Sequence, residues 1–67
     1  MSVYLNVRAI RVRMLEMDLS GVKLAELANV SRQTISTALH RGSCSTATAR
    51  ALAAALEMTI SEIIKED

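Results

Sequence analysis

Two adjacent side chains in the middle of the chain, Arg32 and Gln33, are suited to paired hydrogen bonding with planar partners. A guanidinium group can form two hydrogen bonds with the edge of guanine, and a carboxamide can do the same with adenine. Three short hydroxyl side chains accompany them, Ser31, Ser36 and Thr37. Such hydroxyls bond to base edges and also tolerate the thymine methyl group. These five residues form a polar face with little charge, and we interpret them as candidate base contacts.

The residues needed for an enzyme or a metal site are not apparent. The chain has one histidine and one cysteine, no grouping of His, Asp and Ser, and no glycine-rich phosphate loop. A single cysteine cannot form an internal disulfide or a cysteine-rich zinc site. We therefore expect no catalytic residues, no metal and no cofactor. A structural role for Cys44 is favoured over redox sensing, and a helix-capping role for His40 over a titration switch.

Helices are expected to position the candidate residues, because proline is absent and strong helix formers such as Ala and Leu dominate. Polar N-cap residues and apolar residues at helical spacing divide the chain into five helices. The expected helices start after Asn6 and continue with Gly21–Ala28, Arg32–His40, about Thr46–Glu57, and a last one opened by a Thr59–Glu62 capping box and reaching about Lys65. Residues 2–5 are apolar enough to be extended, and their structure stays open. The prediction is one compact all-α domain over residues 1–67.

The composition of the chain excludes several classes of binding partner. Hydrophobic residues make up 51% of the 67 residues, yet Tyr4 is the single aromatic, so the core must be aliphatic and stacking platforms for single strands or RNA are missing. The formal net charge is only +1, but residues 1–56 hold seven basic and three acidic residues, whereas residues 57–67 hold four acidic residues and Lys65. No apolar run approaches the roughly 20 residues that span a bilayer. We expect a cytoplasmic protein without a membrane partner.

The segment Gly21–His40 has the features of two helices that cross at a sharp turn. Ala25 is small where the two backbones would approach, and Asn29 tolerates the left-handed conformation that the turn needs. Gly42 is expected to end the second of these helices. Four apolar residues at suitable intervals would hold the pair to the core, Leu24, Val30, Ile35 and Ala38. This combination is typical of a helix-turn-helix.

At this point the sequence resembles the lambda Cro and repressor family of helix-turn-helix proteins, also called the Xre-type family. The similarity covers nearly the whole chain and is carried by Leu19-Ser20, Leu24-Ala25, Val30–Ser36, Gly42 and Thr59–Glu62. The family usually has Gln, which helps to hold a phosphate, at the position of Gly21, and usually Gly at the position of Asn29. Residues 43–45 also lack the family's frequent proline. Gly21 has no side chain with which to make that one phosphate contact.

The resemblance implies a lambda-repressor-like fold in which the helix Arg32–His40 lies in the major groove of double-stranded DNA. Phosphate contacts are then expected from the start of the preceding helix and from the residue after the reading helix, namely Ser20, Gly21, Val22, Lys23 and Arg41. Arg8, Arg11 and Arg13 are weaker candidates for the same role, because such a cluster is more often a solvated face. Association at the nucleoid would follow from DNA binding.

Self-association is expected from the C-terminal residues, whose apolar area exceeds what one short helix can bury: Met58, Ile60, Ile63 and Ile64. A two-fold dimer would read half-sites of a pseudo-palindromic operator about 34 Å apart. The expected function is a transcriptional regulator, specifically a repressor of phage or mobile-element type with no small-molecule effector. The alternative is a protein-interaction module on the same fold, such as an antitoxin or anti-repressor. The chain could also be the N-terminal part of a longer repressor.

Overall fold

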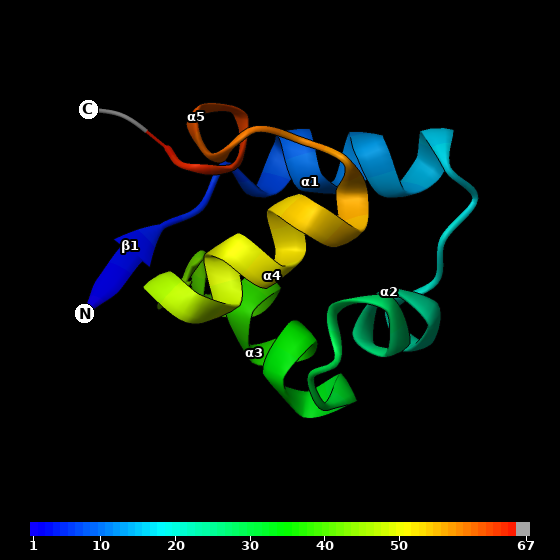
Figure 1. The fold of residues 1–67 in the computed structure, drawn as a ribbon, viewed down its shortest axis with the longest axis horizontal. Helices are drawn as coiled ribbons and strands as arrows, with labels where there is room; N and C mark the ends of the chain where they lie inside the picture. Colours follow the sequence, from blue (N-terminus) through cyan, green and yellow to red (C-terminus); the bar gives the residue numbers. More distant parts are fainter. Residues whose placement is uncertain (66–67) are drawn as a thin grey trace.

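The computed structural model describes residues 1–65, which form five helices and two short strands (Figure 1). The order is β1 (Ser2–Tyr4), α1 (Val7–Glu16), α2 (Gly21–Ala28), α3 (Arg32–Arg41), β2 (Ser43–Ser45), α4 (Thr46–Leu56) and α5 (Ile60–Ile63). The predicted five-helix, all-α class is confirmed, since each strand has only three residues. The helix ends differ slightly from the prediction: α3 includes Arg41, α4 stops before Glu57, and α5 stops before Ile64.

Each helix begins at a polar side chain that accepts a hydrogen bond from a backbone N–H of the first turn. Asn6 Oδ1 accepts from the N–H of Ala9 at 3.1 Å. The hydroxyls of Ser20, Ser31 and Ser45 accept from the residue three positions later at 3.0 to 3.1 Å. At α5, Thr59 and Glu62 form the predicted reciprocal capping box. Each cap stabilises its helix by about 1 kcal/mol, and all five predicted cap positions are confirmed.

Three helices end in a residue with left-handed backbone conformation. The C-cap of α2 is Asn29, with φ 58° and ψ 44°, and that of α3 is Gly42, with φ 73°. The sequence predicts both. Glu57 ends α4 in the same way, with φ 56°, although a residue with a Cβ atom pays about 1–2 kcal/mol for this conformation.

β1 and β2 form an antiparallel pair that the sequence did not predict. Its register joins Ser2 with Ser45, Val3 with Cys44, and Tyr4 with Ser43. Just beyond β1, the N–H of Leu5 donates to the carbonyl of Gly42 at 2.8 Å, and the N–H of Lys65 donates to the carbonyl of Tyr4 at 2.9 Å. The N-terminal segment therefore connects the end of α3 with the end of α5.

The core is aliphatic, as the composition predicts. The largest fully buried side chains are Ile10, Leu24, Leu52, Leu56 and Ile63, whereas Tyr4 is mostly exposed. Among residues 1–65 no polar or charged residue is buried. In α1 the helical spacing of Val7, Ile10, Met14 and Met17 predicts a buried stripe, and the structure shows Ile10 buried and the other three partly buried against the core.

The three-residue spacing of Leu27 from Leu24 predicts that both side chains point into the core, but this is wrong for Leu27, whose side chain is 52% exposed. The buried face of α2 consists of Leu24, Ala25 and Ala28. Successive helical residues turn by about 100°, which places Leu27 more than a quarter of a turn away from the middle of that face. It lies on the solvent side although its spacing from Leu24 suits a broad apolar stripe.

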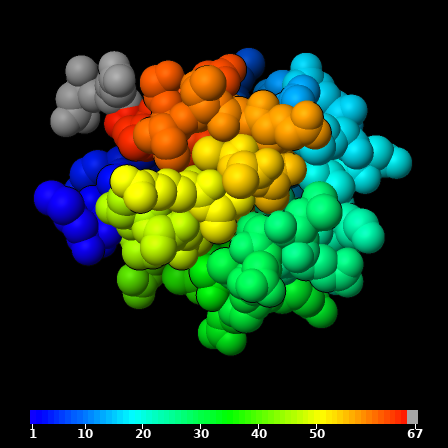
Figure 2. Space-filling model, viewed as in Figure 1, coloured from blue at the N-terminus to red at the C-terminus, as the bar shows by residue number. Residues whose placement is uncertain are grey.

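The corner between α2 and α3 has the small and left-handed residues that the sequence predicts. Ala25 is almost completely buried, and its carbonyl accepts a 3.0 Å hydrogen bond from the N–H of Val30, just after Asn29. Ile35 and Ala38 anchor α3 to the core. α2 and α3 occupy the lower edge of the molecule in Figures 1 and 2, opposite α1 and α5, so the corner forms one end of the molecule.

Candidate nucleic-acid interface

The outer face of α3 is polar along its whole length. Ile35 and Ala38 are the buried residues of this helix, and Thr34 and Leu39 are half-buried. The remaining six side chains are exposed and carry hydrogen-bonding groups, Arg32, Gln33, Ser36, Thr37, His40 and Arg41. Four of the five candidate base contacts therefore lie on one open helix face, and the fifth, Ser31, stands at its start.

This face forms a ridge between two grooves. One, the strand-side groove, has a volume of about 560 Å³ and separates Gln33, Thr37 and Arg41 from the hydroxyl-bearing residues of β1, β2 and early α4. The other, the α1-side groove, has a volume of about 450 Å³. It runs between α3, α1 and the start of α2. Its lining residues include Gly21 and four polar side chains, Arg11, Arg32, Ser36 and His40.

Charge is distributed unevenly over the surface hollows. Neither groove beside α3 is lined by a carboxylate in the part of the chain that the structure describes. A third hollow, between α1 and α5, is lined by Glu16, Glu57 and Glu62 together with arginines of α1. An anion approaching α3 meets arginine and histidine side chains in two grooves without acidic lining residues, so the electrostatics favour a polyanion there.

A family model described as the Cro/C1-type HTH DNA-binding domain matches residues 9–66. The chain belongs to this family. It is therefore a DNA-binding regulator, and α2, the Asn29 turn and α3 are its helix-turn-helix. The resemblance noted in the sequence is confirmed. No curated protein and no solved structure matches the chain significantly.

Within this Cro/C1-type domain, the hydroxyls of two predicted contact residues already have hydrogen-bond partners inside the protein. The hydroxyl of Ser31 accepts from the N–H of Thr34 and lies 2.8 Å from the Thr34 hydroxyl. The hydroxyl of Ser20 accepts from the N–H of Lys23. Each of these oxygens accepts a capping hydrogen bond, whereas the exposed side chains of α3 and the first N–H groups of early α2 have no such role in capping.

The predicted phosphate contacts lie on opposite sides of α3. Gly21 and Val22 line the α1-side groove, and Arg41 lines the strand-side groove. Lys23 is exposed, and its ammonium group lies 3.5 Å from the Glu26 carboxylate in an ion pair between residues three apart. That pair partly offsets its charge. Arg41 forms no ion pair within residues 1–65.

Three further residues line the two grooves although they are not among the main contact residues predicted from the sequence. Thr34 lines the strand-side groove with Gln33, and His40, interpreted from sequence as a cap, lines the α1-side groove with Arg32. A helical wheel drawn for α3 could have found both. Arg11 faces the same groove from α1, and its placement depends on how two distant helices pack.

Cys44 lies in β2, is half-buried, and is one of the residues that line the strand-side groove. Burial raises the pKa of this thiol. The thiolate is the reactive form, so the environment of Cys44 makes it less nucleophilic, which fits a structural role.

The four residues expected to mediate self-association are placed differently from one another. Ile63 is fully buried in the core of its own chain, and Ile64 is half-buried where it forms a bridge with Leu5. Met58 is half-buried, and Ile60 is 39% exposed. Packing between α5, α1 and α4 covers most of this apolar area within the monomer, so Ile60 is the main member left at the surface.

None of the helices formed by residues 1–65 combines the length and the apolar character needed to cross a membrane. Within the same residues no group of three or more His, Cys, Asp and Glu side chains could hold a metal ion.

Proposed function

We propose that this Cro/C1-type domain is a sequence-specific transcriptional regulator that inserts α3 into the major groove of double-stranded DNA. The observation that carries the proposal is the exposed polar ridge of α3 between two grooves without acidic lining residues. An α-helix fits the width of the major groove, and the phosphate strands on both sides of that groove then pass over the two hollows.

The side chains of α3 divide into two reading sets. Arg32 and Ser36 face the α1-side groove, and Gln33 and Thr37 face the strand-side groove. In the proposed complex Arg32 pairs with the O6 and N7 atoms of guanine and Gln33 pairs with adenine. Each well-made bidentate pair contributes about 1–3 kcal/mol of discrimination against a wrong base. Ser36 and Thr37 contribute weaker hydrogen bonds or contacts with thymine methyl groups.

The phosphate strands are held from both sides. Gly21 and Val22 are the first residues of α2, and their N–H groups have no partner within the helix, so they are available to a phosphate oxygen. Arg41 supplies a guanidinium on the other side. Lys23, held near Glu26, and Ser20, which caps α2, contribute less.

We further propose that the protein represses transcription as a dimer on a pseudo-palindromic operator of phage or mobile-element type. One domain makes few phosphate contacts and has a net charge of only +1, so it needs a second half-site for strong binding. Ile60 would be central to the dimer surface, with the exposed parts of Met58 and Ile64 beside it. Ile60→Glu should abolish dimers in sedimentation experiments without unfolding the chain, whereas unchanged dimers would exclude this surface.

Selection of binding sites from random duplexes tests the main proposal. Wild type should recover a consensus, and Arg32→Ala with Gln33→Ala should lose preference at the corresponding positions. Arg50→Ala is the matched control, because Arg50 is an exposed arginine of α4 that lines neither groove beside α3. Recovery of no consensus, together with no retention on heparin, would instead support the alternative of a protein-interaction module.

A further inference from the structure

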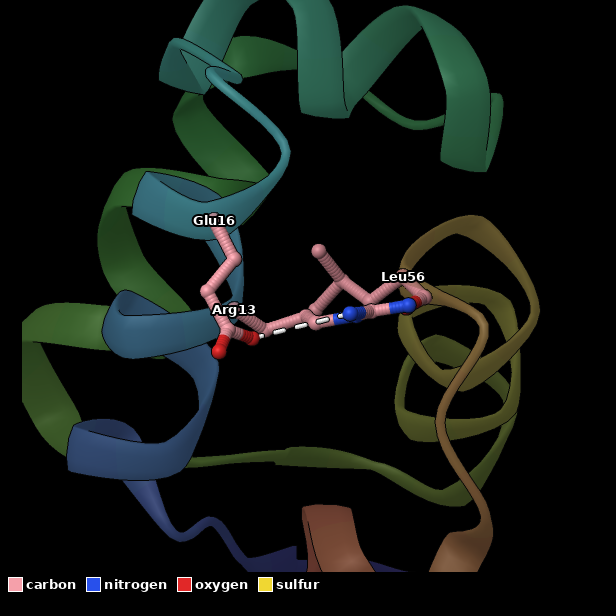
Figure 3. A network of polar contacts seen from close by, with 3 residues as sticks. All are labelled: Arg13, Glu16 and Leu56. Atoms are coloured by element: carbon pink, nitrogen blue, oxygen red, sulfur yellow. Dashed lines mark hydrogen bonds and ion pairs between the residues drawn. The ribbon is translucent and has the colours of Figure 1, made fainter.

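α1 carries three arginines within one and a half turns, Arg8, Arg11 and Arg13, and the structure gives them different surroundings. Arg13 is engaged inside the protein: its Nε donates a 2.8 Å hydrogen bond to the carbonyl of Leu56, and its guanidinium lies 3.5 Å from the Glu16 carboxylate (Figure 3). Its side chain spans the gap between α1 and the end of α4. This arginine has a structural role.

Arg8 is exposed but lies beside acidic groups. It lines the hollow between α1 and α5, whose other lining residues include Glu16, Glu57 and Glu62. The local potential there is lowered by three carboxylates, which would repel a phosphate strand. Arg8 is therefore poorly placed for binding DNA, although its residue type and helix are the same as those of Arg11.

Arg11 lies in the α1-side groove, facing the ridge of α3. The charged or titratable residues that line this groove are Arg11, Arg32 and His40, and no carboxylate lines it. Asp18 lines a second hollow together with Arg11, but within residues 1–65 the two side chains form no ion pair. Arg11 is exposed, and its guanidinium forms no ion pair in the part of the chain that the structure describes.

The same groove is open at the start of α2. Gly21 lines it at the start of α2, and a Cβ atom placed on Gly21 would meet no atom within 4 Å. Arg32, one of the proposed base contacts, borders the groove on the α3 side. In the proposed complex, the DNA strand that flanks the base pairs read by Arg32 passes over this groove, which α1 lines through Arg11.

We propose that Arg11 binds the DNA backbone on the Arg32 side of α3, so that α1 takes part in the DNA interface together with α2 and α3. This inference rests on the proposed function. Arg11 pairs with a phosphate through charge-assisted hydrogen bonds, and it carries no sequence information of its own. Its role is to hold one phosphate strand while α3 reads the bases.

The test compares Arg11→Ala with Arg8→Ala, which removes the same charge from an exposed position of the same helix. Affinities for the selected consensus duplex and for a scrambled duplex are measured between 0.05 and 1 M salt. One phosphate contact contributes about 0.9 to the slope of log affinity against log salt. Relative to 1 M salt, where this contribution vanishes, the contact is therefore worth about 5-fold in affinity at 0.15 M. Arg11→Ala should lose about 5-fold per chain on both duplexes, with a shallower slope, and the loss should vanish near 1 M.

Arg8→Ala should bind like wild type, and both variants should keep the wild-type melting temperature because neither side chain has an internal partner among residues 1–65. Equal affinities of the Arg11 and Arg8 variants would overturn the inference while leaving the proposed function intact. A loss confined to the consensus duplex would also overturn it, since it would make Arg11 a base contact. Absence of DNA binding by wild type would overturn both proposals.

Discussion

The guanidinium of Arg13 donates a 2.8 Å hydrogen bond to the backbone carbonyl of Leu56, 43 residues away, and so joins α1 to the last residue of α4 (Figure 3). The last carbonyls of a helix have no partner within the helix. Glu57 turns the chain away in left-handed conformation directly after Leu56, and Arg13 supplies the missing donor. The backbone N–H groups of Glu57 and Met58 pair with earlier carbonyls of α4, and the charged side chain of Arg13 satisfies the carbonyl of Leu56.

Arg13→Met should lower the free energy of unfolding by about 1 kcal/mol. Methionine keeps the apolar part of the side chain and removes the hydrogen-bond donor. The Arg13 side chain is about one-third exposed, so solvent screens its hydrogen bond and keeps the contribution near 1 kcal/mol. For a domain of this size the melting temperature should fall by about 4–8 °C. Arg8→Met is the control and should melt like wild type. If the two variants melted alike, the Arg13 contact would contribute nothing measurable.

Asn29→Ala should destabilise the domain, whereas Asn29→Gly should not. Asn29 has φ 58° and ψ 44°, and its side chain makes no hydrogen bond within residues 1–65, so its contribution is conformational. Alanine tolerates this backbone poorly and should cost about 1 kcal/mol in urea unfolding, while glycine adopts it freely. Similar losses for both substitutions would show that the asparagine side chain itself contributes.

The helices and their caps could be predicted because their signals are local. Ser20, Ser31 and Ser45 each bind an N–H three residues away, and Asn29 and Gly42 act through their own backbone. The pairing of β1 with β2 could not, since Ser2 and Ser45 lie far apart in sequence and three-residue strands leave no alternating pattern. The burial of Leu27 was predicted wrongly for a related reason, because its exposure depends on which side of α2 the other helices cover.

The candidate site divides in the same way. The polar face of α3 follows from the order of residues within one helix, and the structure places Arg32, Gln33, Ser36 and Thr37 at the surface as that order implies. By contrast, Arg8, Arg11 and Arg13 look equivalent in the sequence. Their surroundings differ because of how α1 packs in the fold. Arg13 bonds to the end of α4, Arg8 lies beside acidic residues, and Arg11 lines the groove next to α3. The burial of Ile63 likewise depends on tertiary packing.

Gly21→Gln should strengthen DNA binding and also raise stability. A Cβ atom at this position has open space around it, and a glycine at a helical position costs unfolding free energy that another residue recovers, about 0.4–1 kcal/mol. The added carboxamide can donate to a phosphate over the α1-side groove, worth about 0.5–1.5 kcal/mol in binding. Gly21→Ala separates the two effects, because it should raise the melting temperature without changing affinity. A glutamine variant that binds no better than the alanine variant would contradict the phosphate contact.

The capping box of α5 should make stability depend on pH through Glu62. The backbone N–H of Thr59 donates to the Glu62 carboxylate at 2.8 Å and its hydroxyl donates at 3.0 Å, and these bonds, with a smaller contribution from the charge of Arg13, lower the pKa of Glu62. Because the folded-state pKa is depressed, the stabilisation is present above the unfolded pKa near 4.3 and is lost as pH falls through the folded value.

Glu62→Gln can keep the hydrogen bonds but removes the charge. Urea unfolding of both proteins between pH 7 and pH 3 should show wild type more stable at neutral pH and the two proteins converging below about pH 4. A stability difference that stays constant over this range would mean that the ionised carboxylate has no special role at the start of α5.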